Sequence, residues 1–257
     1  MARLLARRAL ITGGASGIGA AAANLFCQEG ASVLLVDRDP AALEHTAASL
    51  GERYPTARVI GLAADVADVD AARQATQVAV EAWGGLDTLV CNAAMRNYSL
   101  LSLASPDEWQ AMVNVNLLGT ANYIRAALPA LREANGASVV IVSSCYAVTG
   151  RAGMGIYDAT KAGLLAMTRT LAFEEAQHGV RVNAVCPGST LTEFHVRRAQ
   201  ERGKPIDELK QERTDTSLLR RWANPEEIAW PIVWLASDEA SFITGTHLMV
   251  DGGLSIM

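Results

Sequence analysis

Tyr157 and Lys161 are the pair whose types and spacing point most directly to chemistry. They lie four positions apart in a stretch with helical periodicity, so their side chains share one helix face with Cβ atoms about 5–6 Å apart. A free tyrosine has a pKa of about 10, too high for a base at neutral pH, and a neighbouring ammonium favours the phenolate. The pair predicts a tyrosine acting as a general acid or base, although an exposed helix pair without that role has the same spacing.

Ser144 lies thirteen positions before Tyr157, at the end of an apolar run. The carboxyl ends of parallel strands are where α/β proteins bind ligands, so its hydroxyl is expected to hold a substrate oxygen. Ser143 points to the opposite face by strand alternation, so only one of the two should enter the site. Asn92 and Asn116 are polar residues in apolar settings and need partners, whether structural or catalytic.

A glycine-rich segment, Thr12–Gly19 (TGGASGIG), joins the first apolar run to a helical stretch. Glycines at such a junction let the backbone approach a pyrophosphate, while the helix N-terminus supplies free N–H groups and a partial positive charge. A tight turn between a strand and a helix is the alternative. The positions expected to contact a dinucleotide are Gly13, Ser16, Gly17, Ile18 and Gly19.

Asp37 ends the second apolar run, eighteen positions after Gly19. A carboxylate there accepts hydrogen bonds from the adenosine ribose and repels a 2′-phosphate, which favours NAD over NADP. Arg38 follows at once and could hold a phosphate. Asp37 could also be a turn or cap residue, yet the Asp39–Pro40 pair already provides a helix start. The charge argument predicts NAD as the cofactor.

The elements that must position these residues alternate along the whole chain. Helical stretches are predicted at 17–29, 40–50, 68–82, 106–133, 155–178 and 225–236, and strands at 9–11, 32–36, 58–62, 86–91, 137–142, 180–185 and 247–250. Continuous apolar strands joined by helices indicate a parallel sheet covered on both faces, with right-handed crossovers. The predicted fold is α/β: a single Rossmann-type domain over residues 1–257, with a doubly wound seven-stranded parallel sheet flanked by helices.

One long connection, residues 189–222, is dense in charge and begins where the sixth strand ends. Because ligands in such a sheet bind beyond the carboxyl ends of the strands, this segment is expected to be a mobile lid over a substrate. A solvated helical excursion that serves only packing is the alternative.

Composition narrows the class of protein. The 257 residues are 50% hydrophobic and 19% charged with a net charge of −5, as in a soluble globular protein whose partner is a small molecule rather than nucleic acid or an anionic membrane. Four scattered cysteines without a C-x-x-C pair indicate reduced thiols and a cytoplasmic location, and no metal site is expected. No apolar stretch reaches the roughly 18 residues of a membrane span. The first predicted strand follows Met1 too closely for a targeting peptide, so we expect a mature protein.

Together these residues resemble the short-chain dehydrogenase/reductase family, in its NAD-preferring branch with chains of this length. Asn116, Ser144, Tyr157 and Lys161 are similar to the family's catalytic tetrad in order and spacing. The other matching elements are the glycine loop, the adenine contact Asp65–Val66, the Asn92–Ala94 element, the nicotinamide-binding residues Pro187, Gly188 and Thr192, and the carboxyl-terminal signatures at 225–229 and 251–253.

The resemblance implies roles for the tetrad. Tyr157 would be the general acid/base at the carbinol or carbonyl oxygen, and Ser144 would hydrogen-bond the same oxygen. Lys161 would lower the tyrosine pKa and hold the nicotinamide ribose, and Asn116 would anchor a water in a proton relay. The hydride would move between the nicotinamide and the substrate carbon, with the protein supplying positioning and electrostatics.

Two positions depart from or refine the family pattern. Ala94 replaces the usual glycine, which adds a methyl group near the cofactor but removes no polar contact. Ser16 stands where many NADP-using members carry arginine, in agreement with Asp37.

Pocket walls in the family come from the segments after the fourth, fifth and sixth strands. Their cations and hydroxyls favour a polar secondary alcohol such as a sugar or polyol, although Arg96, Arg151 and His195 serve equally well as solvated rim residues. Cys145 is expected to pack rather than react, since no cationic neighbour is identified. The candidate substrate contacts are Arg96, Tyr98, Cys145, Tyr146, Arg151, Met154, Phe194 and His195.

The predicted function is therefore that of an NAD-dependent oxidoreductase interconverting a secondary alcohol and a ketone. An NADPH-dependent 3-oxoacyl-thioester reductase and a non-catalytic dinucleotide-binding protein are the alternatives. The intact tetrad opposes the second alternative, and Asp37 with the acidic balance opposes the first. The resemblance also implies a homotetramer in which the helical stretches 106–133 and 155–178 contact partners.

Overall fold

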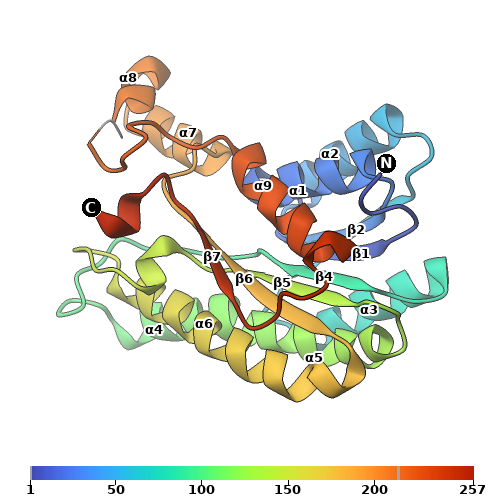
Figure 1. The fold of residues 1–257 in the computed structure, drawn as a ribbon. Helices are drawn as coiled ribbons and strands as arrows, with labels where there is room; N and C mark the ends of the chain where they lie inside the picture. The colour runs from blue at the N-terminus through green and yellow to red at the C-terminus, as the bar shows by residue number, and fades with distance from the viewer. Residues whose placement is uncertain (1, 213–214) are drawn as a thin grey trace.

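The computed structural model describes residues 2–212 and 215–257, built around a seven-stranded parallel sheet (Figure 1). Its spatial order is β3-β2-β1-β4-β5-β6-β7, and every neighbouring pair is parallel. The predicted doubly wound fold is confirmed, with each predicted strand present. The strands are β1 (Arg8–Thr12), β2 (Ser32–Asp37), β3 (Val59–Ala63), β4 (Thr88–Cys91), β5 (Ser138–Val142), β6 (Arg181–Pro187) and β7 (His247–Val250).

Helices cover both faces of the sheet (Figure 1). α1 (Gly17–Gln28), α2 (Pro40–Arg53) and α9 (Pro225–Ala236) pack on one face, and α3 (Val69–Trp83), α5 (Gly119–Arg132) and α6 (Gly155–Glu175) on the other. Successive strand side chains alternate between the two apolar layers: Ile11 joins the first layer and Leu10 the second. Because both faces are buried, the strands read as continuous apolar runs in the sequence.

The predicted helix 106–133 is not one regular helix. α4 (Pro106–Val113) and α5 are joined by a π-helical turn, η1 (Asn114–Leu118). A capping box at Ser105 and Glu108 starts α4, and the wider turn brings the fully buried Asn116 inward. Single π-turns inside helices are frequent at functional sites.

The insertion 189–222 is closed at its base. Leu191 N–H donates to Ala223 O at 2.9 Å, and Ala223 N–H donates to Ser189 O at 2.9 Å. Within it lie α7 (Glu193–Glu201) and α8 (Ile206–Gln211), which rise above the sheet layers in Figure 1. Trp222 is buried against them and its Nε1 donates to Leu209 O at 2.9 Å. The insertion is thus a helical unit where the structure describes it; its residues 213 and 214 lie outside the described part.

The site is positioned where the chain changes direction in the sheet. From β1 the chain runs outward to β2 and β3, and it then returns to β4 on the other side of β1. Ligands in open α/β sheets bind at this switch point, beyond the carboxyl ends of the strands. No helix in the described residues is long and apolar enough to span a membrane.

Candidate active site

The glycine loop is held against the end of β4 with no room for a side chain at Gly13 or Gly19. A Cβ on Gly13 (φ +65°) would lie 2.8 Å from Ala93 Cα, and one on Gly19 would lie 2.0 Å from Gly13 O. Asn92 fixes this arrangement, because its Nδ2 donates to Thr12 O at 3.1 Å and to Gly13 O at 3.0 Å. The loop is therefore close-packed backbone, as phosphate cradles require.

The first turn of α1 carries backbone N–H groups toward the insertion. Gly17 has a φ of +54°, and a Cβ there would meet Thr192 Cγ2 at 3.1 Å. Its N–H donates to Glu193 Oε2 at 2.7 Å. The Glu193 carboxylate thus accepts a hydrogen bond from a backbone N–H at a helix N-terminus, and such N–H groups bind the phosphates of dinucleotides. The cradle and its donors fit a dinucleotide pyrophosphate.

The residues expected to face an adenosine lie at the carboxyl ends of β2 and β3. Asp37 Oδ2 accepts from Ala15 N–H at 3.1 Å, which ties the carboxylate to the glycine loop. Asp65 is exposed, whereas Val66 is buried and packs against Gly119. Each carboxylate also accepts a hydrogen bond from the backbone N–H two residues further on, Asp37 from Asp39 and Asp65 from Ala67.

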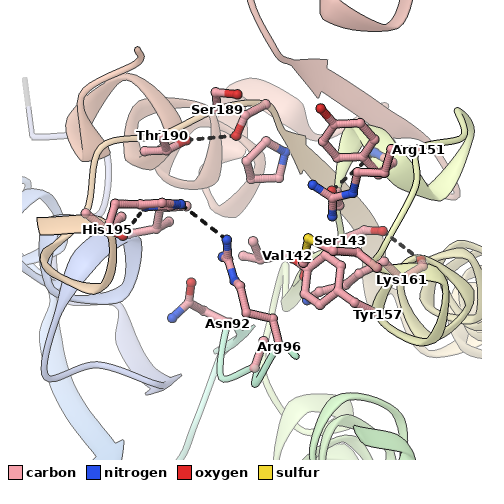
Figure 2. A pocket seen from close by; sticks show the side chains of 18 of the residues that line it. Asn92, Arg96, Val142, Ser143, Arg151, Tyr157, Lys161, Ser189, Thr190 and His195 are labelled. Atoms are coloured by element: carbon pink, nitrogen blue, oxygen red, sulfur yellow. Dashed lines mark hydrogen bonds between the residues drawn. The ribbon is translucent and has the colours of Figure 1, made fainter. Parts of the chain in front are cut away.

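A cavity of about 170 Å³ opens at the ends of β4, β5 and β6 (Figure 2). It brings Ser144, Tyr157 and Lys161 together with nicotinamide-segment residues Pro187, Gly188 and Thr192. The other predicted residues on its wall are Ile18, Asn92, Arg96, Tyr98, Tyr146, Arg151, Met154 and His195. Of the predicted site residues, Asn116, Cys145 and Phe194 do not line it, and neither do Gly13, Ser16, Gly17, Gly19, Asp37, Asp65 and Val66.

Tyr157 lies in the first turn of α6 and is almost completely buried. Burial raises the pKa of its phenol, and the guanidiniums of Arg96 and Arg151 oppose that rise. Lys161 lies one turn further, with Nζ 5.6 Å from the Tyr157 ring centroid, and donates to Val142 O at 2.7 Å. Burial lowers the pKa of Lys161 to about 7. In this arrangement the charges that lower the tyrosine pKa are the two arginines.

The two serines after β5 have different hydrogen-bond partners, but both line the cavity, where only one was expected to enter the site. Ser143 Oγ donates to Lys161 O at 2.7 Å, which attaches β5 to α6. Ser144 Oγ accepts from Tyr146 N–H at 3.2 Å. Both reach the cavity wall, but the hydroxyl of Ser143 is bound to backbone, so Ser144 is the better placed to contact a substrate.

Asn116 has its side-chain amide fully engaged with protein. Its Oδ1 accepts from Met95 N–H at 2.8 Å, and its Nδ2 donates to Met95 O at 3.0 Å and to Thr160 Oγ1 at 3.1 Å. The amide joins the segment after β4 to α6, one residue before Lys161. Through these hydrogen bonds Asn116 holds the segment after β4 and helix α6, which both line the cavity, in fixed relative positions.

Cys145, one of the candidate substrate contacts, does not line the cavity. It begins the 3₁₀ turn η2 (Cys145–Ala147) and is fully buried. Burial raises the pKa of its thiol to about 12, which keeps the thiol protonated and unreactive. The expectation that it packs holds.

Contacts between the insertion and the segment after β4 close one side of the cavity. Arg96 Nη1 lies 3.4 Å from His195 Nε2, and its guanidinium carbon lies 4.9 Å from the Phe194 ring centroid. Arg198 stacks on Tyr98 at 3.4 Å. Phe194 therefore acts on the wall through Arg96 rather than by lining it.

Sequence reasoning missed two acidic residues of the site. Asp158 pairs with Arg151 through two hydrogen bonds of 2.8 and 3.2 Å, and Glu193 holds Gly17. Both directly follow residues that were singled out, Tyr157 and Thr192. Their negative charge marked them as possible site residues, but the groups that they bind lie on other segments and could be identified only from the fold.

The fold, the glycine cradle and the cavity define a dinucleotide-binding oxidoreductase site, and comparison with known proteins agrees. A family model described as enoyl-(acyl carrier protein) reductase matches residues 13–255. The 3-oxoacyl-[acyl-carrier-protein] reductase FabG of Thermotoga maritima is 36% identical over 99% of this chain and 100% of its own. The L-rhamnose 1-dehydrogenase (NAD(P)(+)) of Azotobacter vinelandii is 33% identical over 98% of both chains.

Solved structures are similar over the same span. The L-sorbose reductase of Gluconobacter frateurii, complexed with NADPH and L-sorbose, matches with a TM-score of 0.93 and 31% identity, covering 100% of both chains. The chain belongs to the short-chain dehydrogenase/reductase family. Its cofactor is a nicotinamide dinucleotide.

Proposed function

We propose that this protein is an NAD-dependent oxidoreductase that interconverts a secondary alcohol and a ketone, with a sugar or polyol as substrate. The observation that carries the proposal is the convergence of Ser144, Tyr157 and Lys161 on one cavity beside the glycine cradle. Three residues from two elements share that wall, so the acid/base group and a hydroxyl meet at the place where α/β sheets bind ligands.

In this proposal Tyr157 takes the hydroxyl proton of the alcohol on its phenolic oxygen, or returns it to the carbonyl oxygen. Ser144 hydrogen-bonds the same substrate oxygen. Lys161 is anchored on Val142 O, and its role in this proposal is to hold the nicotinamide ribose. A bound nicotinamide dinucleotide supplies the hydride acceptor or donor. Asn116 acts as a positioning residue through its contacts with Met95 and Thr160.

NAD is proposed over NADP because of Asp37. The carboxylate is held beside the glycine loop by Ala15 N–H, where its charge repels a 2′-phosphate. Ser16 places no cation there. Arg38 is exposed and, within residues 2–212 and 215–257, makes no hydrogen bond or ion pair that would fix its guanidinium beside Asp37.

A sugar or polyol is proposed because the cavity wall carries many hydrogen-bonding groups. The residues that can together bond several oxygens are Arg96, Tyr98, Tyr146, Arg151 and His195. Similarity to an L-rhamnose dehydrogenase and an L-sorbose reductase supports this substrate class. The insertion 189–222 is proposed to cover the bound substrate, because α7 already contacts the opposite wall through Arg96 and Tyr98.

Similarity to FabG favours one alternative, an NADPH-dependent 3-oxoacyl-thioester reductase. Acyl-carrier partners are acidic and require a basic docking patch, whereas this chain has a net charge of −5. Asp37 also opposes NADPH.

The experiment is a substrate panel with purified protein, followed by the absorbance of the reduced cofactor. Sugars, polyols, cyclic alcohols and hydroxysteroids are offered with NAD and, separately, with NADP, and a 3-oxoacyl thioester is offered with NADPH. We expect oxidation of sugars or polyols with NAD. Activity on cycloalkanols without polyols would overturn the substrate class, activity with NADP alone would overturn the cofactor, and thioester reduction alone would establish the alternative.

A further inference from the structure

The charge of the cavity wall differs from that of the whole chain. The chain has 27 acidic and 22 basic residues. The wall carries Arg96, Arg151 and Lys161 together with His195, and no Asp or Glu lines it among the described residues. The cavity wall is therefore basic although the chain as a whole is acidic.

Two of these three cations already have oxygen partners. Arg151 makes a two-hydrogen-bond ion pair with Asp158 and stacks on the Tyr146 ring at 3.6 Å. Lys161 Nζ is bound to Val142 O, and its burial shifts its pKa toward the neutral form. Neither residue offers an uncompensated charge to a ligand.

Arg96 is different. No carboxylate pairs with it anywhere in residues 2–212 and 215–257; its contacts are His195 Nε2 and the rings of Tyr157 and Phe194. Because a guanidinium only donates, His195 Nε2 must be the acceptor in that contact, so the contact brings no negative charge. Figure 2 shows Arg96 reaching into the middle of the cavity toward His195, beside Tyr157.

Arg96 lies close to Tyr157, the residue proposed to exchange a proton with the substrate oxygen. Its guanidinium carbon lies 5.4 Å from the Tyr157 ring centroid. A planar guanidinium binds a carboxylate or phosphate with two parallel hydrogen bonds, and this pairing strengthens away from bulk water. An anionic group on Arg96 would then lie a few bonds from the carbinol that Tyr157 addresses.

We propose that the substrate is an anionic secondary alcohol, such as a sugar acid or a sugar phosphate, whose charged group pairs with Arg96. This inference rests on the proposed function and names the chemistry of its substrate. In the oxidation the carbinol C–H bond gives its hydrogen and both electrons as hydride to NAD, the hydroxyl proton goes to Tyr157, and a C=O bond forms. The anionic group is unchanged and serves only for recognition.

The test compares neutral and charged members of matched sets. Glucitol, gluconate and glucitol 6-phosphate form one set, and 2-butanol with 3-hydroxybutyrate forms a second. The quantity measured is the ratio of kcat/KM for the anion to kcat/KM for its neutral partner. Effects of Arg96 on the Tyr157 pKa enter both values and cancel in this ratio. The separate acid and phosphate arms identify which anion fits.

We expect the wild-type ratio to exceed about tenfold and Arg96→Gln to lower it by about tenfold to a hundredfold. Arg96→Lys keeps the charge and should retain part of the preference. Arg169→Gln, on an exposed arginine of α6, is the matched control and should leave the ratio unchanged. A wild-type preference for the neutral partner, or an unchanged ratio in Arg96→Gln, would overturn the inference.

Calorimetry supplies a readout that does not depend on turnover. Gluconate and glucitol are titrated into wild-type protein and Arg96→Gln, each with NADH present. We expect gluconate to bind the wild-type protein more tightly than glucitol and to lose this advantage in the variant. Oxidation of neutral alcohols without this advantage would sink the inference and leave the proposed function standing, whereas no oxidation and no binding in any set would overturn both.

Discussion

Glu193 of the insertion accepts a 2.7 Å hydrogen bond from the backbone N–H of Gly17, at the start of α1. These residues are 176 positions apart, and their contact joins the insertion to the cofactor cradle. The carboxylate lies where the helix dipole and free N–H groups favour an anion. We therefore expect cofactor phosphates and this carboxylate to compete for the same donor.

Glu193→Gln is expected to tighten cofactor binding about threefold to tenfold, because the neutral amide no longer repels the pyrophosphate. NADH titrations by fluorescence measure the change, with Glu201→Gln at the far end of α7 as the control. The same factor should apply to NADPH, since both cofactors carry the pyrophosphate. Weaker binding in Glu193→Gln would show that the carboxylate supports the cofactor site instead.

The pH dependence should follow the ionisation of Tyr157. Oxidation needs the phenolate, and burial raises the pKa of this tyrosine, so the oxidation rate should rise as pH increases toward the alkaline side. Reduction needs the protonated phenol and should fall over the same range. Profiles of kcat/KM in both directions test this, and an oxidation rate that is flat or falls with rising pH would contradict the acid/base role.

Asp37→Asn tests the cofactor preference by removing charge while keeping side-chain size. The ratio of kcat/KM with NADP to that with NAD should rise about tenfold, since the repulsion of the 2′-phosphate is lost. Asp39→Asn is the control two residues along, where the side chain caps α2. Equal ratios in both variants would mean that Asp37 does not select the cofactor.

An ion pair between α5 and α6 should govern part of the acid stability. Arg132 donates to both carboxylate oxygens of the buried Glu175, at 2.8 and 2.6 Å, which lowers the pKa of Glu175. Glu175→Gln is expected to lower the free energy of unfolding at neutral pH by about 2 kcal/mol. Denaturant titrations measure this, with the exposed Glu174→Gln as the control.

The pH sign of that contribution follows from the lowered pKa. The stabilisation is fully present above the ordinary carboxyl pKa of 4.5 and is lost as pH falls through the lower folded-state pKa. The difference between the wild-type protein and Glu175→Gln should therefore shrink on acidification. A difference that grows at low pH would contradict this account.

Much of the fold was predictable because strands buried on both faces leave continuous apolar runs. The shared face of Tyr157 and Lys161 likewise follows from the local geometry of a helix. Strand alternation did not predict that both Ser143 and Ser144 line the cavity. The π-helical turn at Asn114–Leu118 was not predictable, because it depends on contacts that Asn116 makes with distant residues.

Contacts between side chains on different helices, strands or loops could not be predicted from the sequence either. Arg96 and Arg151 have the same residue type in neighbouring segments, yet one is paired with Asp158 and the other faces the cavity. Glu193 could be placed on Gly17 only by the fold. The homotetramer, the cytoplasmic location and the choice of NAD stay predictions.

The most direct test of the central claim is turnover by wild-type protein and Tyr157→Phe with NAD and the alcohol panel, with NADH affinity measured for both proteins. We predict oxidation by the wild-type protein, a loss of about a hundredfold to ten-thousandfold in Tyr157→Phe, and unchanged NADH binding. Turnover retained in Tyr157→Phe would contradict the assignment of Tyr157 as the group that moves the proton.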